Sequence, residues 1–263
     1  MPYWISIVIL GIIEGITEFL PVSSTGHLLI AEHWLPKQTD LFNVVIQSGA
    51  VLAVIPLFSD RFHKFIHQWR EPATRDYLLK IMLAFGLTCI GGFILEKKHI
   101  KLPEELKPVA LALLIGGILF LAIEYFVRGK KLGTEITWTV ALVVGLGQLI
   151  AAAFPGASRS GTTILLSLLL GLSRPAATEF SFLVGIPTML AAGGYKIFKA
   201  LHHPEIGAPK EDWAMVLLAS IVAAVVSFVA VKWLLRYVQT HTFNAFGWYR
   251  IVVGILILAF LLH

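Results

Sequence analysis

The sequence has few charged residues and a single cysteine among its 263 residues. Charged residues make up 14% of the chain and hydrophobic residues 57%, whereas a typical soluble domain has about 25% charged residues. The only cysteine, Cys89, lies in an apolar run, which excludes disulfides and cysteine–metal sites. The apolar runs are continuous and do not alternate with polar residues, which excludes a β-barrel. We therefore expect an all-α polytopic membrane protein.

The polar parts of the chain are short and mostly basic. The N-terminal segment MPYWISIV lacks a basic region and no small-residue cleavage site follows it, so we expect no cleavable signal peptide. The net charge of +5 is expected to come from loop lysines and arginines that contact anionic headgroups. Nucleic acid is not an expected partner, because no connection is long enough to form a soluble domain with a basic face.

Six apolar stretches are long enough to span a bilayer, which takes about 20 residues. They cover residues 41–59, 77–95, 107–127, 176–198, 213–235 and 245–262. We therefore predict a single integral membrane domain over 1–263. The distribution of lysine and arginine weakly favours a cytoplasmic 60–76 connection, with both termini outside.

Two other apolar segments are interrupted. Residues 3–20 run into Pro21 and a cluster of hydroxyl side chains, and residues 137–154 run into Pro155 and GASRSGTT. Half-length apolar pieces on either side of such a break are typical of re-entrant helix hairpins. Irregular backbone at membrane depth is tolerated where protein or a water-filled cavity surrounds it.

The two breaks also align with each other. A displacement of 134 residues places Gly11 on Gly145, Glu14 on Gln148, Pro21 on Pro155 and Ser24 on Ser158. Each half, about 1–130 and 134–263, then consists of one re-entrant hairpin and three transmembrane helices. An odd number of crossings inverts the second half relative to the first. Because inverted repeats with broken helices hold a site at the repeat interface, we expect the two breaks to meet.

The first break begins with two glutamates on one helix face. Glu14 and Glu18 are four residues apart, so their side chains lie one turn apart on the same side. Carboxylates that flank phosphate oxygens commonly hold Mg²⁺ or Ca²⁺. The alternative is a pair of interface glutamates that hydrogen-bond to their neighbours, although ionisable groups inside membranes usually have a function.

A run of hydroxyl side chains follows where the next helix should begin. Ser23, Ser24 and Thr25 can form an anion site there together with backbone N–H groups, and Gly26 would let the backbone approach a ligand closely. His27 follows Ser24 by three residues and could reach its hydroxyl, which provides a nucleophile and a base. The alternative is an ordinary helix cap with an interfacial histidine.

The second break, PGASRSGTT (155–163), carries a basic residue where the first carries acids. Arg159 is expected to be the only arginine far from a membrane edge, and its guanidinium suits a phosphate or a carboxylate. In the alternative, Arg159 only neutralises Glu14 or Glu18. Gln47, inside the first full span, is expected to line the same cavity. Further donors come from Ser158, Ser160, Thr162 and Thr163.

At these residues the sequence resembles the undecaprenyl-pyrophosphate phosphatase family associated with bacitracin resistance. The resemblance rests on EGITEFLPVSSTGH (14–27), PGASRSGTT (155–163) and EFSFL (179–183), and it extends along essentially the whole chain. It implies a hydrolase of the bacterial inner membrane that removes the terminal phosphate from an isoprenoid pyrophosphate and so recycles the lipid carrier of cell-wall synthesis. It also implies a divalent cation and an active site that faces the periplasm.

The residues and the resemblance together predict three groups of site residues. Catalysis is assigned to Ser24, His27, Glu18 and Arg159, and binding of Mg²⁺ or Ca²⁺ to Glu14 and Glu18. The residues expected to bind substrate are Ser23, Thr25, Gly26, Ser158, Ser160, Thr163 and Gln47. Ser24 is the favoured nucleophile with His27 as its base, whereas direct attack by His27, or by water that His27 activates, remains an alternative.

A second class of function fits the same architecture. Inverted repeats with broken helices also occur in transporters, so a carrier that moves a lipid phosphate across the membrane is the alternative to a phosphatase. Transport alone would not require two glutamates beside a serine and a histidine. The expected partners are the isoprenoid pyrophosphate, membrane lipids and, in a homodimer, a second copy of the chain.

Overall fold

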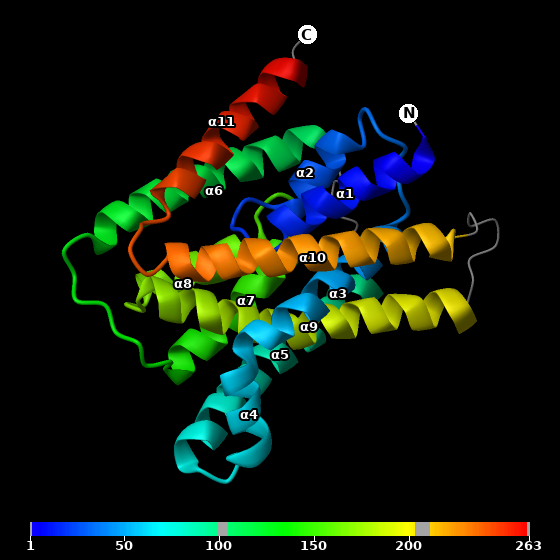
Figure 1. The fold of residues 1–263 in the computed structure, drawn as a ribbon. Coiled ribbons are helices and arrows are strands. Elements are labelled where there is room, and N and C mark those ends of the chain that lie inside the picture. Colours follow the sequence, from blue (N-terminus) through cyan, green and yellow to red (C-terminus); the bar gives the residue numbers. More distant parts are fainter. Residues whose placement is uncertain (1, 99–104, 203–210, 262–263) are drawn as a thin grey trace.

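The computed structural model describes residues 2–98, 105–202 and 211–261, which form helices and contain no β-strand (Figure 1). The predicted all-α class is therefore confirmed. In chain order the elements are α1 (Tyr3–Thr17), α2 (Ser24–Ala31), α3 (Asp40–Val54), the 3₁₀ helix η1 (Ile55–Phe58), α4 (Ser59–His67), α5 (Pro72–Lys97), α6 (Leu106–Val127), α7 (Trp138–Ala153), α8 (Arg159–Leu169), α9 (Arg174–His202), α10 (Trp213–Tyr237) and α11 (Asn244–Leu261).

Six helical segments are long and apolar enough to cross a membrane, as predicted. They are Asp40–His67, Pro72–Lys97, Leu106–Val127, Arg174–His202, Trp213–Tyr237 and Asn244–Leu261. The first is longer than expected, because α3 continues through η1 into the polar helix α4 instead of ending near residue 59. The chain is thus a multi-pass membrane protein.

The other two apolar helices are short and end at the predicted breaks. Helix α1 has 15 residues and α7 has 16, fewer than the ~20 that a full span needs. Each is followed by an irregular stretch and a second short helix, α2 or α8 (Figure 1). The interrupted helices are confirmed, and their entry into a bilayer from opposite sides stays a prediction.

Each short hairpin packs on a helix from the other half of the chain, through a glycine. A Cβ atom at Gly11 of α1 would lie 2.8 Å from the carbonyl oxygen of Ala219 on α10. A Cβ atom at Gly145 of α7 would lie 2.9 Å from the carbonyl oxygen of Ala84 on α5. Small residues at such contacts let helix backbones approach closely in membranes. The matched glycines of the predicted repeat therefore make matched contacts.

The remaining matched helices pack against each other in opposite directions. Asp40 at the start of α3 pairs with Lys196 near the end of α9, whereas Glu179 near the start of α9 pairs with Arg61 on α4. Helices α6 and α11 are likewise antiparallel. A Cβ atom at Gly117 of α6 would lie 2.6 Å from the carbonyl oxygen of Gly247 on α11, and one at Gly254 of α11 would lie 2.9 Å from that of Ala110 on α6. Inverted repeats require this relation between matched helices, and the repeat boundaries stay a prediction.

The two halves differ by one residue just before the second helix of each hairpin. Ser23 and Ser158 are the N-caps of α2 and α8 and have φ of 75° and 69°. One residue separates Pro21 from its cap, whereas Gly156 and Ala157 separate Pro155 from its cap. From the caps onward the displacement is therefore 135, not 134. The counterpart of Ser24 is Arg159, and the predicted match of Ser24 with Ser158 is wrong.

Candidate active site

Both breaks end in a serine that caps the following helix. The Ser23 hydroxyl accepts the Gly26 N–H at 3.3 Å, and the Ser158 hydroxyl accepts the Gly161 N–H at 3.1 Å. Both serines are buried and hold a left-handed backbone that few non-glycine residues adopt. The first turns of α2 and α8 therefore begin at fixed points, and the positive ends of both helix dipoles lie at the breaks.

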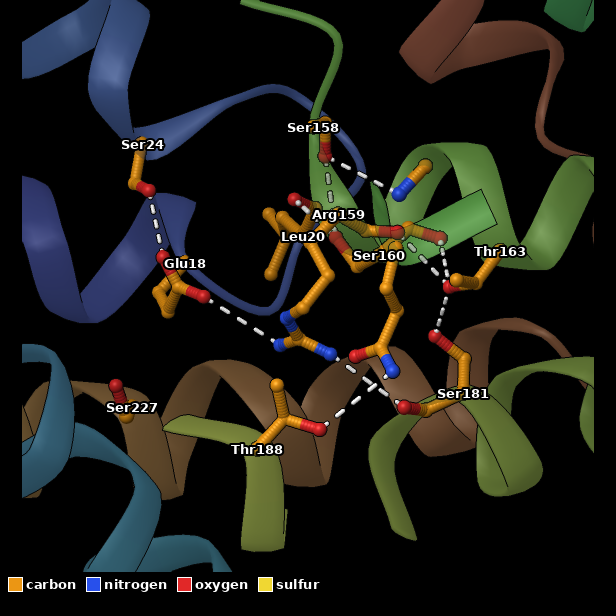
Figure 2. Close-up of polar contacts among 12 residues, drawn as sticks. Glu18, Leu20, Ser24, Ser158, Arg159, Ser160, Thr163, Ser181, Thr188 and Ser227 are labelled. Atoms are coloured by element: carbon orange, nitrogen blue, oxygen red, sulfur yellow. Dashed lines mark hydrogen bonds and ion pairs between the residues drawn. The ribbon is translucent and has the colours of Figure 1, made fainter. Parts of the chain in front are cut away.

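Glu18 joins the first break to the second (Figure 2). One carboxylate oxygen accepts the Ser24 hydroxyl at 2.6 Å, and the other accepts the Arg159 guanidinium at 3.4 Å. Arg159 also donates to the Ser181 carbonyl at 3.4 Å. This series of contacts joins three residues that were all predicted to belong to the site, namely Ser24, Glu18 and Arg159. The predicted meeting of the two breaks is confirmed, and the expected cross-repeat ion pair exists with Glu18.

Glu14 is fully buried one turn before Glu18. Among the residues that the structure describes, neither of its carboxylate oxygens has a hydrogen-bond partner. Two orphaned acceptors at a carboxylate fit a divalent cation. The same residues contain no group of three histidine, cysteine, aspartate or glutamate side chains placed to hold a metal. A cation here would therefore take its other ligands from phosphate oxygens or water, as Mg²⁺ commonly does.

Within the described residues, the His27 ring forms no hydrogen bond with Ser24. Its Nδ1 lies 2.7 Å from the Ser23 carbonyl oxygen and its Nε2 lies 2.7 Å from the Tyr249 hydroxyl on α11. The predicted hydrogen bond between Ser24 and His27 is therefore wrong for this structure, because the Ser24 hydroxyl points to Glu18 and the imidazole turns toward α11. In this arrangement the acceptor closest to Ser24 is a carboxylate.

The hydroxyl side chains of the second break form hydrogen bonds within the protein that stabilise the conformation of the break. Ser160 is completely buried and donates to the Leu20 carbonyl in the first break at 3.2 Å, beside the Ser158 hydroxyl (Figure 2). Thr163 faces α9, where its hydroxyl lies 2.5 Å from that of Ser181. Ser160 and Thr163 thus connect three segments of backbone around Arg159.

Three predicted binding residues lie outside this network. Thr25 is exposed on α2. Gly26 packs on α6, where an added Cβ would lie 3.2 Å from a methyl group of Val109, so the close approach that it permits is to a helix. Gln47 is half-buried on α3 and, within the described part of the chain, forms no hydrogen bond with the other site residues.

An arginine that the sequence did not single out connects the two breaks. Arg250 of α11 is completely buried, and its guanidinium donates to the Pro21 carbonyl of the first break at 3.2 Å. It also donates to the carbonyls of Gly156 and Ala157 in the second break, at 3.0 and 3.2 Å, and to that of Ala112 at 3.2 Å. No carboxylate forms an ion pair with it among the described residues, so its charge is compensated by these backbone carbonyls and by the Phe120 ring, whose centroid lies 5.9 Å from Cζ.

The sequence analysis singled out Arg159 alone, but Arg250 is also buried, in contact with both breaks. Arg250 lies five residues into the predicted 245–262 span, close enough to its start to resemble an interfacial arginine. A useful signal was available in its neighbour, because Gly116 leaves the space in which the Arg250 guanidinium lies. That relation becomes visible only when α6 and α11 are placed together.

The contacts of Arg250 predict a large loss of stability in Arg250→Lys. The ammonium keeps the charge but lacks the planar fork that reaches both breaks, so we expect a loss of about 3 kcal/mol. For a chain of this size that corresponds to a decrease of roughly 5–10 °C in the Tm of the detergent-solubilised protein. Arg236→Lys, at an exposed arginine of α10, is the matched control. Equal Tm values for the two variants would contradict the role of Arg250 in connecting the two breaks.

Comparison with known proteins shows the family to which this chain belongs. The sequence profile of the family described as bacitracin resistance protein BacA matches residues 7–256. A protein named undecaprenyl-diphosphatase from Rhizobium etli (strain CIAT 652) is 50% identical over 97% of this chain and 96% of the relative. The protein of the same name from Xanthomonas axonopodis pv. citri (strain 306) is 48% identical over 98% and 97%. The chain therefore belongs to the bacitracin resistance protein BacA family.

Proposed function

We propose that this protein is an undecaprenyl-diphosphatase, which hydrolyses undecaprenyl pyrophosphate to undecaprenyl phosphate and inorganic phosphate. The observation that carries the proposal is the Ser24–Glu18–Arg159 chain at the meeting point of the two breaks. It lies in a protein about half identical, over nearly the full length, to relatives that carry this name. The reaction would recycle the lipid carrier of cell-wall synthesis in the inner membrane, with the site facing the periplasm.

The terminal phosphate would bind at Arg159 and the two helix starts. The guanidinium has five N–H donors, and the two hydrogen bonds that it donates among the described residues are both 3.4 Å long. Its Nε is buried without a partner among the described residues. Donors that are held in place but weakly used can stabilise the charge that develops on a transferred phosphoryl group.

Ser24 is the group best placed to attack the terminal phosphorus. Its hydroxyl already donates to Glu18 at 2.6 Å, so the carboxylate can accept the proton as the new O–P bond forms. The bond from phosphorus to the bridging oxygen then breaks and releases undecaprenyl phosphate. Water attacks the Ser24 phosphoester and releases inorganic phosphate. This assignment replaces His27 with Glu18 as the base for Ser24.

A divalent cation fits beside these groups. Glu14, with both oxygens unpartnered within the described chain, would hold Mg²⁺ or Ca²⁺. Glu18, one turn later on the same side of the chain, would provide a further carboxylate oxygen to the cation. When bound, such a cation would neutralise pyrophosphate charge and support the leaving phosphate. The carboxylate of Glu14 would then be satisfied without a protein donor.

The function is tested with the purified full chain in detergent and a short-chain prenyl pyrophosphate. We expect phosphate release that a chelator abolishes and that Mg²⁺ or Ca²⁺ restores. Arg159→Ala should lower kcat/KM by about 10²–10³-fold, because it removes the main donor to the phosphoryl group. Arg236→Ala, at an exposed arginine, should leave the rate unchanged. Absence of release with either cation would refute the activity, and normal release by Arg159→Ala would refute the site.

The nucleophile is tested by rapid quenching with substrate labelled at the terminal phosphorus. We expect a labelled phosphoserine at position 24, since the Ser24 hydroxyl already donates a hydrogen bond to Glu18, its proposed base. Ser24→Ala should form none, and Ser173→Ala in the loop before α9 is a control that should form the normal amount. Full phosphate release with no labelled enzyme at any quench time would indicate direct attack by water.

Gly185 of α9 leaves room for the Arg159 guanidinium. A Cβ atom at this buried glycine would lie 1.9 Å from Arg159 Nη1 and 2.6 Å from Cζ. Gly194, on the same helix, would place a Cβ with no neighbour within 4 Å in the part of the chain that is described. The two glycines therefore differ in their relation to the site but share a helix.

We expect Gly185→Ala to lower kcat/KM about tenfold or more by displacing Arg159, which a loss of about 1.4 kcal/mol of phosphoryl stabilisation would cause. Gly194→Ala should keep the rate. In the Arg159→Ala background, Gly185→Ala should have no further effect, as a double-mutant cycle would measure. A similar fractional loss in both backgrounds would contradict a role exerted through Arg159.

A further inference from the structure

Two hydrogen bonds hold both ring nitrogens of His27. Nδ1 lies 2.7 Å from the carbonyl oxygen of Ser23, and Nε2 lies 2.7 Å from the hydroxyl of Tyr249. The two rings are also stacked, with centroids 5.6 Å apart and planes inclined by 5°. Helix α2 supplies the histidine and its own cap residue supplies the carbonyl, whereas α11 supplies the tyrosine.

These contacts fix the tautomer of a neutral His27. A carbonyl oxygen only accepts hydrogen bonds, so Nδ1 must carry the proton and donate it to Ser23. Nε2 is then the nitrogen with the free lone pair, and the Tyr249 hydroxyl donates to it. The basic nitrogen therefore faces α11 and not the Ser24 hydroxyl, which donates to Glu18.

Tyr249 is held where this contact requires it. The next residue, Arg250, is buried and bonded to carbonyls of both breaks, which fixes this turn of α11 against the first turns of α2 and α8. Tyr249 itself is 45% exposed, so its position follows from the helix turn that Arg250 anchors.

We propose that Tyr249 is a positioning residue for His27: the Ser23 carbonyl keeps the proton on Nδ1, and the Tyr249 hydroxyl, by donating to Nε2, holds the basic nitrogen in one orientation. The catalytic consequence rests on the proposed phosphatase function, whereas the hydrogen bond to Nε2 does not. A histidine whose Nδ1–H donates to a backbone carbonyl exchanges protons through its other nitrogen. With Ser24 paired to Glu18, His27 is available for the later step, the activation of the water that attacks the phosphoserine.

The proposal is tested with Tyr249→Phe, which keeps the stacked ring and removes only the hydroxyl. Side-chain ¹⁵N NMR of histidine-labelled full-length protein in detergent, at mildly alkaline pH, reports the tautomer and whether Nε2 accepts a hydrogen bond. His27→Gln identifies the His27 signals. We expect the Nδ1-protonated tautomer with a hydrogen-bonded Nε2 in the wild type and in the control Tyr125→Phe, whose tyrosine is exposed on α6. Tyr249→Phe should keep this tautomer, which the Ser23 carbonyl fixes, and should shift the Nε2 signal to that of a nitrogen without a donor.

The kinetic arm uses the same variants. Tyr249→Phe should lower kcat about tenfold and leave KM within about twofold, which corresponds to the loss of about 1.4 kcal/mol in a step after binding. An unchanged Nε2 signal in Tyr249→Phe, or a shifted signal with normal kcat, would overturn the positioning role. A wild type without phosphatase activity would refute the proposed function, while the NMR result would still decide whether Tyr249 holds Nε2.

Discussion

A helix that breaks at membrane depth leaves backbone carbonyl groups that neither the helix nor lipid can satisfy. In this protein one buried guanidinium serves both breaks, because Arg250 donates to Pro21 in the first and to Gly156 and Ala157 in the second. Neither break can keep its geometry without the other. The relative position of α2 and α8, and hence of every group at the site, depends on this shared donor.

The two halves use similar geometry for opposite charge. Ser23 and Ser158 cap their helices in the same backbone conformation, yet the next residue is Ser24 in one half and Arg159 in the other. The counterpart of Glu14 is Gln148, a neutral amide that donates to Thr88 at 2.8 Å. Acidic groups thus come from the first hairpin and the cation from the second, so the site exists only where both meet (Figure 2).

Some groups at the site are held in place with fewer hydrogen bonds than they can make. Within the described residues, both Glu14 oxygens and the Arg159 Nε have no partner, whereas the surrounding hydroxyls of Ser158, Ser160 and Thr163 are bonded. An unpartnered buried polar group is costly and is retained mainly where a ligand completes it. The site therefore combines a rigid frame with reactive groups that pyrophosphate and a cation would satisfy.

Much of the fold and most of the site residues could be predicted from the sequence, because span length and helix breaks depend on local composition. The six spans and the two broken helices follow from local chemistry, and the meeting of the two breaks follows from their internal repetition, although the sequence left open whether Arg159 pairs with Glu14 or Glu18. The base that the Ser24 hydroxyl contacts could not be predicted in this way, since His27 and Glu18 are both within reach of Ser24 along the chain. Packing of α11 decided it: Tyr249 turns the imidazole away and Arg250 closes the breaks. Tyr249 is 222 positions from His27, and Arg250 is 93 to 229 positions from the carbonyls to which it donates, so no local pattern encodes these contacts.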